Sequence, residues 1–367
     1  MMKDNYYAMI MAGGGGTRLW PLSRRGRPKQ SLKLFGDDTL FQVAVERITP
    51  IFKRENINIL TVEDQARILE TQVEWLKPDN FLLEPAPRGT AAAIGLAAMS
   101  LREGDEEGVM ACLTADHFIG DEELFRSLLL AAYDAATEGH LVTLGIRPDY
   151  ADTGYGYIQQ GESAGRYNDF EAYQALQFRE KPDQETAEAY LSSGDFVWNS
   201  GMFVWRVDRI LAEIERQMPE LFRVLEEMGV AWDDRERDDT LPQSWMDLES
   251  VTIDYGIMEG ARDVVVLPVE GLGWLDVGDW SRLFDIQSKD KTGNVVLADE
   301  TILDEVKDTL ILQDGSGTSD RLIAALGVHD LIIIDVDDVL LICSRDRAGE
   351  VKRLVDSLRD KGNLKYL

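Results

Sequence analysis

The fold is decided by a stretch near the N-terminus that reads Tyr6-Tyr7-Ala8-Met9-Ile10-Met11, then Ala12-Gly13-Gly14-Gly15-Gly16-Thr17-Arg18. The apolar run has the length and composition of a buried strand. The four glycines allow a tight turn and let backbone N–H groups approach a ligand closely. A concave row of such N–H groups suits an anion, most often phosphate. The stretch therefore predicts a strand followed directly by a phosphate-binding loop.

Positively charged side chains follow the glycines at short intervals. They are Arg18, Arg24, Arg25, Arg27, Lys29 and Lys33, and no acidic residue lies between Asp4 and Asp37. The rest of the chain is strongly acidic, with a formal net charge of -29 and a pI near 4.4. The basic segment therefore favours a polyphosphate ligand over the alternative, a solvated loop whose arginines cap helices.

The loop matches neither of two common nucleotide motifs. A P-loop requires Gly-Lys-Ser/Thr after its glycine spacing, but Thr17 and Arg18 follow Gly16. In the dinucleotide fingerprint, Arg18 would occupy the place of the third glycine. The spacing to Asp37 and Asp38 does not exclude that fingerprint, but the cluster of cations argues against it.

Composition limits the class of protein. A length of 367 residues allows a large core and predicts two domains. The acidity argues against nucleic acid or an anionic membrane as a partner. The sequence shows no signal peptide and no apolar stretch of membrane-spanning length. Cys112 and Cys343 are expected to be buried free thiols, which indicates a cytoplasmic protein.

Further along the chain, strand-like and helix-like segments alternate. Apolar runs predict strands at 57–62, 81–83, 108–113 and 141–146, and helical spacing predicts helices over 40–51, 63–76, 91–101 and 122–136. This alternation indicates a parallel sheet with helices on both faces. Ligands bind beyond the carboxyl ends of the strands in such sheets, so the glycine loop and Glu84-Pro85 would lie at the same edge.

Two further candidate positions follow from this arrangement. The segment from Glu84 to Thr90 precedes a helix, whose unpaired N–H groups could hold an anion or a base. For Thr90 alone, an ordinary capped helix start is as good an explanation. Asp116 follows the strand at 108–113, where a carboxylate can hold Mg²⁺ beside substrate phosphates.

The glycine stretch, continued by Leu19-Trp20-Pro21-Leu22-Ser23-Arg24 and Pro28-Lys29-Gln30, resembles the signature of sugar-1-phosphate nucleotidylyltransferases. The details at Trp20, Ser23-Arg24 and Pro28-Lys29-Gln30 resemble the mannose-1-phosphate guanylyltransferase branch. Four later motifs extend the resemblance over nearly the whole chain: Thr153-Gly154-Tyr155-Gly156-Tyr157-Ile158, Phe178-Arg179-Glu180-Lys181-Pro182, Trp198-Asn199-Ser200-Gly201-Met202-Phe203 and Trp274-Leu275-Asp276-Val277-Gly278-Asp279-Trp280. Two positions depart from the family pattern, with Gly89 where Asn is common and Thr114 where Pro is usual.

The resemblance implies a role for each of these motifs. The implied nucleotide-binding residues are Ala12, Gly13, Gly14, Gly15, Gly16, Thr17, Arg18, Lys29, Glu84, Pro85, Thr90 and Asp116. The implied sugar-phosphate-binding residues are Gly156, Glu180, Lys181, Asn199 and Gly201. Asp116 and Asp276 would bind Mg²⁺ and, with Arg18 and Lys29, would form the catalytic set. The Ile253–Glu259 segment also resembles the family, and we interpret it mainly as packing.

The resemblance also implies the architecture. We expect an α/β fold, with a Rossmann-like, mostly parallel sheet flanked by helices and an antiparallel insert on the sugar side. This catalytic domain would span 1–288, with a less ordered acidic segment at 233–239. A small left-handed β-helix with a terminal helix would span 289–367 and contribute to a homodimer.

The implied reaction transfers GMP from GTP to α-mannose 1-phosphate, with Mg²⁺ as the cofactor and no covalent intermediate. Two alternatives stay open. One is a sister enzyme for another sugar phosphate or base. The other is a catalytically silent GDP-mannose-binding regulator, although a regulator would have no need to keep both aspartates of the metal pair.

Overall fold

A computed structural model describes residues 2–232, 243–314 and 321–367. Its contacts divide the chain into two compact units. The first comprises Met1–Gly13, Val43–Ala115 and Ile119–Trp274, and the second comprises Gly14–Gln42, Asp116–Phe118 and Leu275–Leu367. The second unit is therefore larger than the predicted domain at 289–367, because it includes the glycine loop and the segment around Asp116. The predicted acidic segment at 233–239 lies outside the described residues.

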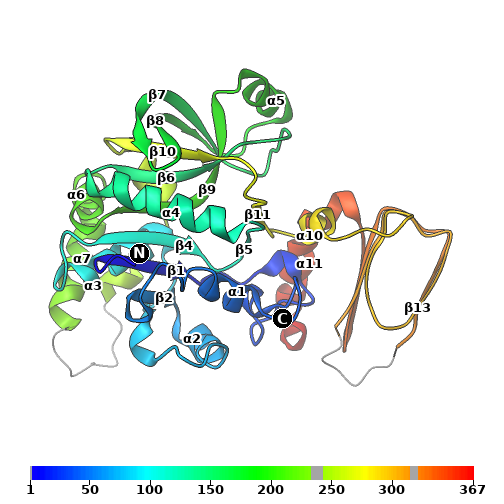
Figure 1. The fold of residues 1–367 in the computed structure, drawn as a ribbon. Coiled ribbons are helices and arrows are strands. Elements are labelled where there is room, and N and C mark those ends of the chain that lie inside the picture. Colours follow the sequence, from blue (N-terminus) through cyan, green and yellow to red (C-terminus); the bar gives the residue numbers. More distant parts are fainter. Residues whose placement is uncertain (1, 233–242, 315–320) are drawn as a thin grey trace. The chain divides into compact units, whose positions relative to one another are not determined.

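The first unit is built on one large sheet (Figure 1). Its strands are β1 (Tyr6–Met11), β2 (Ile57–Thr61), β3 (Phe81–Leu83), β4 (Val109–Thr114), β6 (Leu141–Ile146), β7 (Tyr157–Tyr167), β8 (Phe170–Arg179), β9 (Phe196–Arg206) and β10 (Val264–Val269). The order among the described residues is β3-β2-β1-β4-β9-β6-β10-β8-β7. Only β8 and β9 run against the others, which confirms the mostly parallel α/β fold.

The antiparallel strands that the sequence analysis expected on the sugar side are part of the large sheet itself. β9 pairs with both β4 and β6 in the middle of the sheet, and the β7–β8 hairpin extends the same sheet. The physical reason is the composition of β9, in which the successive residues Phe203, Val204 and Trp205 are all buried, so both faces of the strand are covered. A strand that is apolar on both faces belongs inside a sheet.

Helices cover both faces of the sheet. The helices of this unit are α2 (Glu63–Leu69), α3 (Gly89–Arg102), α4 (Glu122–Thr137), α5 (Gln184–Ser193), α6 (Val207–Gln217), α7 (Pro219–Trp232), α8 (Gln243–Met246) and α9 (Ile253–Gly256). On one face, the hydroxyl of Tyr6 donates to the Leu129 carbonyl of α4 at 2.9 Å. On the other face, Met9, Met110 and Trp205 pack with α3 and α6 in one buried cluster. Tyr6 and Met9, which are three positions apart in β1, thus face opposite layers, because successive side chains of a strand alternate between its two faces.

Two of the predicted helices are shorter than their apolar spacing indicated. α1 spans Leu40–Glu46 and α2 ends at Leu69, whereas helices were expected over 40–51 and 63–76. Ile48, Val73 and Leu76 are nevertheless buried. These three residues lie in turns and irregular backbone that follow the helices, and their side chains still pack into the core. The apolar spacing therefore predicted which residues are buried, but the prediction of helix at these positions was wrong.

The C-terminal part of the second unit is a β-helix of short stacked strands. It contains β12 (Val295–Leu297), β13 (Thr301–Asp304), β14 (Leu310–Gln313), β15 (Ile323–Leu326), β16 (Leu331–Val336) and β17 (Val339–Ser344). β12, β14 and β16 pair in parallel, β13 and β15 pair in parallel, and β17 closes one ladder in the antiparallel sense. The outer helices of the unit are α10 (Trp280–Ile286) and α11 (Lys352–Asp360).

The segment 14–42 belongs to this unit through specific contacts. The indole N–H of Trp20 donates to the Tyr366 carbonyl at 2.7 Å, and the indole N–H of Trp280 donates to the Trp20 carbonyl at 3.0 Å. Arg24 pairs with Asp338 at 2.6 Å, and Arg27 pairs with Asp314. Two cations of the basic stretch are therefore engaged by carboxylates of the chain itself, which the sequence analysis did not anticipate.

Within the three described ranges, no helix combines the length and the apolar character needed to cross a bilayer.

Candidate functional site

The glycine loop follows β1 and leads into a short 3-10 turn at Thr17–Leu19. Gly14 and Gly16 have φ values of 96° and 55°, in the left-handed region that glycine enters without strain. At Gly16 a Cβ atom would lie 2.6 Å from the Lys29 Cβ atom. Gly16 is therefore required by the close approach of Lys29, while Gly13, Gly14 and Gly15 are exposed.

Lys29, Asp116 and Asp276 form one charged cluster in the second unit. The Lys29 ammonium lies 2.7 Å from an oxygen of Asp116 and 3.3 Å from an oxygen of Asp276. The two carboxylates meet because β5 (His117–Phe118) pairs antiparallel with β11 (Leu275–Asp276), which places Asp276 opposite His117. This two-residue bridge thus brings together Asp116 and Asp276, which are 160 residues apart in the chain. The structure brings together the two aspartates that the resemblance singled out.

The electrostatics of this cluster keep Lys29 and Asp276 ionised. Burial opposes charge on Asp276, but Lys29, His117 and Arg18 together hold the pKa of its carboxyl below the ordinary value. Burial also opposes charge on Lys29, yet Asp116 and Asp276 raise the pKa of its ammonium. Arg18 is exposed beside Gly278, its guanidinium about 3.7 Å from where a Cβ atom of Gly278 would be. The cluster therefore presents fixed charges of both signs next to the glycine loop within one unit.

A second group of predicted residues lies at the edge of the large sheet. The Thr61 hydroxyl donates to the Ala12 carbonyl at 2.7 Å, and the Glu84 N–H donates to the Thr61 carbonyl at 2.8 Å. Burial raises the pKa of Glu84 to about 7, although a hydrogen bond from the backbone N–H of Arg88 lowers the pKa in part. A carboxyl group with this pKa is poised between its neutral and charged forms at physiological pH. Perturbed groups of this kind mark candidate functional sites.

The start of α3 is held by residues 244–253, of which the sequence analysis singled out only Ile253. The Ile253 N–H donates to the Thr90 hydroxyl at 2.8 Å, and the Ala91 N–H donates to the Val251 carbonyl at 3.1 Å. A Cβ atom at Gly89 would lie 2.3 Å from the Val251 carbonyl oxygen. This close approach, together with a φ of 82°, explains why glycine stands where the family commonly has asparagine.

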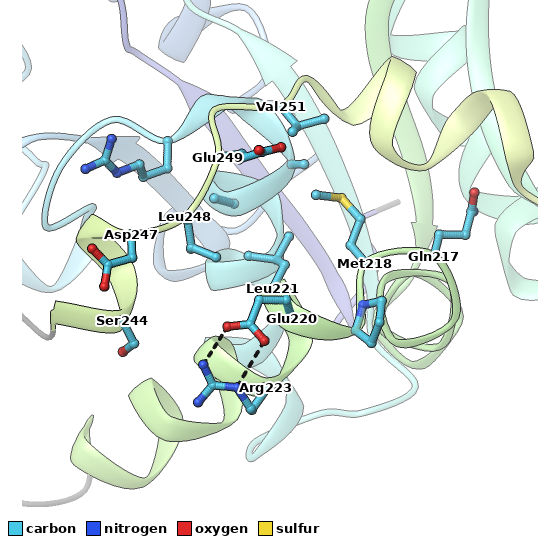
Figure 2. A pocket seen from close by; sticks show the side chains of 14 residues that line it. Gln217, Met218, Glu220, Leu221, Arg223, Ser244, Asp247, Leu248, Glu249 and Val251 are labelled. Atoms are coloured by element: carbon cyan, nitrogen blue, oxygen red, sulfur yellow. Dashed lines mark hydrogen bonds and ion pairs between the residues drawn. The ribbon is translucent and has the colours of Figure 1, made fainter.

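Residues of the 244–253 segment also border a cavity of about 570 Å³. Figure 2 shows Ser244, Leu248 and Val251 of the segment around this cavity, with Met218 and Leu221 of α7 and its approach across from them. The residues that line it include none of the predicted site residues. The cavity therefore lies among this segment, α7 and the start of α3, where Arg88, Ala91 and Ala92 also line it.

The predicted sugar-side residues come together in the first unit. The Asn199 N–H donates to the Gly156 carbonyl at 2.8 Å, and a Cβ atom at Gly156 would lie 2.5 Å from a carboxylate oxygen of Glu180. Lys181 pairs with Glu180 at 3.6 Å and has an unusual φ of 44°. Gly201 donates its N–H to the Asn199 side-chain oxygen at 3.0 Å. All five predicted residues therefore lie in one connected group.

Asp254 is the residue of this group that sequence reasoning missed. Its carboxylate accepts a hydrogen bond from the Asn199 amide at 2.6 Å, and it lines the same pocket as Glu180 and Glu259. The Ile253–Glu259 segment was interpreted as packing, and Ile253, Ile257 and Met258 are indeed buried. One feature of the sequence could have identified Asp254 as a candidate site residue: it is a carboxylate next to apolar residues in a segment that resembles the family.

In the part of the chain that the structure describes, no group of three or more His, Cys, Asp and Glu side chains is placed to hold a metal ion.

Comparison with known proteins places this geometry in a family. Residues 7–293 match the nucleotidyl transferase family model, and residues 316–358 match the MannoseP isomerase/GMP-like β-helix domain. The chain is 37% identical to the mannose-1-phosphate guanylyltransferase of Escherichia coli K12, over 99% of this chain and 75% of that protein. It is 38% identical to ManC, a mannose-1-phosphate guanylyltransferase of Salmonella typhimurium LT2, with the same coverage.

A crystal structure from Thermus thermophilus, described as a mannose-1-phosphate geranyltransferase, is similar over 97% of this chain and 99% of its own length. The identity is 34% and the TM-score is 0.83. The chain therefore belongs to the nucleotidyl transferases, a family of enzymes. Within that family it is a member of the mannose-1-phosphate guanylyltransferase group.

Proposed function

We propose that the protein transfers the GMP moiety of GTP to α-D-mannose 1-phosphate and forms GDP-mannose and pyrophosphate. A phosphate oxygen of the sugar phosphate attacks the α-phosphorus of GTP in line, and the bond to the β-phosphate breaks. The observation that carries the proposal is the Lys29–Asp116–Asp276 cluster beside the glycine loop, in a chain whose relatives are mannose-1-phosphate guanylyltransferases. No protein nucleophile is needed, so positioning and charge neutralisation are the tasks of the site.

The donor set of the cluster fits Mg²⁺. Asp116 and Asp276 offer carboxylate oxygens, and Mg²⁺ in phosphoryl-transfer sites usually takes one or two carboxylates besides substrate phosphates. Both carboxylates already contact the same cation, the Lys29 ammonium. The two side chains are therefore close enough together to bind one metal ion between them. When bound, Mg²⁺ would neutralise the charge of the transferring phosphate.

The residues of the chain would act on the triphosphate as follows. The glycine loop from Ala12 to Thr17 would hold the phosphates through backbone N–H groups. Arg18, which is exposed beside Gly278, would face the leaving pyrophosphate. Lys29 would stabilise the charge that builds on the α-phosphate.

Recognition of the base and the sugar would fall to the residues of the first unit. Glu84, with Pro85 and Thr90, would hold the guanine, since a carboxylate can accept hydrogen bonds from N–H groups of the base. Glu180 and Asn199, with Gly156 and Gly201, would fix the mannose hydroxyls. Lys181 would meet the sugar phosphate. Such fixed polar partners are needed because the sugar hydroxyls lose water on binding.

The test is pyrophosphate release measured with GTP, ATP, UTP and dTTP against mannose, glucose and galactose 1-phosphates in the presence of Mg²⁺. We expect the pair of GTP and mannose 1-phosphate to give the highest kcat/KM. A preference for another pair would identify a sister enzyme. Tight binding of GDP-mannose with no turnover on any pair would identify a regulator.

We also propose a homodimer that forms through the β-helix. Ile302 and Leu326, on the outward side of the β13–β15 ladder, are 59% and 70% exposed. Exposed apolar surface of this kind is typical of interaction sites. The paired substitution Ile302→Ser with Leu326→Ser should halve the molar mass seen by light scattering, while Leu364→Ser, at a similarly exposed leucine (62%), should not. A wild-type monomer would contradict the proposal.

The two free cysteines, Cys112 and Cys343, support a reducing, cytoplasmic location, which cell fractionation would test.

A further inference from the structure

We propose that Asp254 is a positioning residue of the sugar-binding group, which fixes the side-chain amide of Asn199 and is itself held in place by the 244–253 segment. The proposal rests on the function proposed above and deepens it. Asp254 would determine which hydrogen-bond donors and acceptors Asn199 presents to the sugar.

The contacts of Asn199 determine the orientation of its amide. Its nitrogen donates to an Asp254 oxygen at 2.6 Å, and its oxygen accepts the Gly201 N–H at 3.0 Å. An ionised carboxylate only accepts hydrogen bonds and a backbone N–H only donates. Rotation of the amide by half a turn would therefore set two acceptors against each other at Asp254 and two donors against each other at Gly201. The remaining hydrogen of the Asn199 amide is thereby given a fixed direction.

Stability does not explain the presence of a carboxylate at this position. Asp254 is partly buried and shares a pocket with two further carboxylates, Glu180 and Glu259. Burial raises the pKa of Asp254 against the effect of the Asn199 bond. Burial of Glu180 likewise raises the pKa of its carboxyl, and the nearby Asp254 adds to that rise while Lys181 opposes it. Burying a charge among like charges is costly, so the carboxylate needs a functional reason.

The 244–253 segment connects Asp254 to the start of α3. The Trp245 indole N–H donates to the Ala86 carbonyl at 2.8 Å, and Arg88 donates to the carbonyls of Trp245 (3.2 Å) and Met246. At the end of the segment, Ile253 donates its N–H to the Thr90 hydroxyl, and Ala91 donates its N–H to the Val251 carbonyl. Asp254 is the next residue after this bonded run. One continuous piece of backbone therefore bridges from 86–91, the proposed base-binding side, to Asn199 on the sugar side.

The side chains of the segment contact both the core and the cavity. Trp245 and Ile253 are buried in the hydrophobic core, whereas Ser244, Leu248 and Val251 border the cavity shown in Figure 2. The position of Asp254 is therefore set by the bonds to 86–91 and by the buried side chains of Trp245 and Ile253.

The first test compares Asp254→Leu and Asp254→Asn with wild type in steady-state kinetics. Asp254→Leu removes the acceptor and should raise the KM for the sugar phosphate by about tenfold or more, the usual effect of a lost hydrogen bond to a charged group. The KM for GTP should change by less than about twofold. Asp254→Asn keeps one acceptor oxygen and should recover most of the sugar affinity. Glu249→Gln, an exposed carboxylate on the same segment, is the matched control and should behave as wild type.

The second test reverses the pair. Asn199→Asp sets two carboxylates against each other and should weaken sugar-phosphate binding further. Adding Asp254→Asn to it restores one donor against one acceptor, so the double variant should bind more tightly than Asn199→Asp alone. Contacting residues show such non-additive behaviour, and the recovery is measured in the KM for the sugar phosphate, with the KM for GTP as the reference.

Thermal unfolding distinguishes positioning from folding. Asp254→Leu should unfold at the wild-type temperature or above it, because a desolvated charge has been removed. An unchanged KM for the sugar phosphate, equal rises in both KM values, or no recovery in the reversed pair would each overturn the proposal. Failure of the proposed function would appear separately, as wild-type enzyme that makes no GDP-mannose, and the comparison would then use the sugar phosphate that the wild type accepts.

Discussion

Replacement of Asp276 by asparagine should lower kcat by about a thousandfold or more while the protein still folds. The side chain keeps its shape but loses its charge, and neutralisation of the transferring phosphate by a bound metal is worth several kcal/mol. Folding should survive because the cluster holds one cation and two anions: with Asp276 neutral, Lys29 and Asp116 still form a pair at 2.7 Å. Pyrophosphate release, titrated with Mg²⁺, measures the loss.

Asp116→Asn should give a loss of similar size, and the double variant should be little worse than either single one, because residues that act as a unit are non-additive. Asp285→Asn, an exposed aspartate on α10 of the same unit, is the matched control. Near-normal turnover of Asp276→Asn at low Mg²⁺ would remove Asp276 from the metal pair and leave it a turn residue.

Glu84→Gln should stabilise the protein at pH 8, by at most about 3 kcal/mol, and should have little effect at pH 4.5. The folded state raises the pKa of Glu84 from 4.5 to about 7 because the carboxyl is buried. The unfolded chain therefore loses its proton first, so wild-type stability falls as pH rises from 4.5 through 7. Glutamine removes this dependence. Urea unfolding of both proteins across this pH range measures the difference.

Glu70→Gln, an exposed glutamate at the end of α2, is the control and should leave the pH profile unchanged. A constant difference between wild type and Glu84→Gln at all pH values would contradict the raised pKa. The same variant should bind GTP less tightly at pH 8, because we propose that the charged carboxylate accepts hydrogen bonds from the guanine.

The features that the sequence predicted best are local. The strand β1, the glycine loop and the strand before Asp116 follow from apolar runs and from glycine chemistry within a few residues. Parallel pairing then placed Ala12 and Glu84 at one edge of the sheet, through Thr61. The family was recognised from motifs, the β-helix was expected because the family resemblance implies one, and the family models confirm both.

The features that could not be derived from local pattern depend on distant pairing. Asp276 alone has the appearance of an ordinary turn residue, and only the β5–β11 bridge makes it the neighbour of Asp116. Arg24 and Arg27 were counted with the phosphate-binding cations, but their carboxylate partners lie about 300 residues further along. Asp254 was missed because its partner Asn199 is 55 residues away. Periodicity carries no information on such contacts.

The placement of residues 14–42 in the second unit has a consequence for synthesis. The ribosome synthesises this segment early, but its contacts cannot form until the residues that it contacts have also been synthesised. These residues are Trp280, Asp314, Asp338 and Tyr366. Domains normally fold in order from the N-terminus as they emerge, and contacts between distant segments form slowly. The nascent chain can therefore complete its large sheet while residues 14–42 still lack these contacts, and the loop that we propose to bind the triphosphate gains its full support only after Tyr366 has been synthesised.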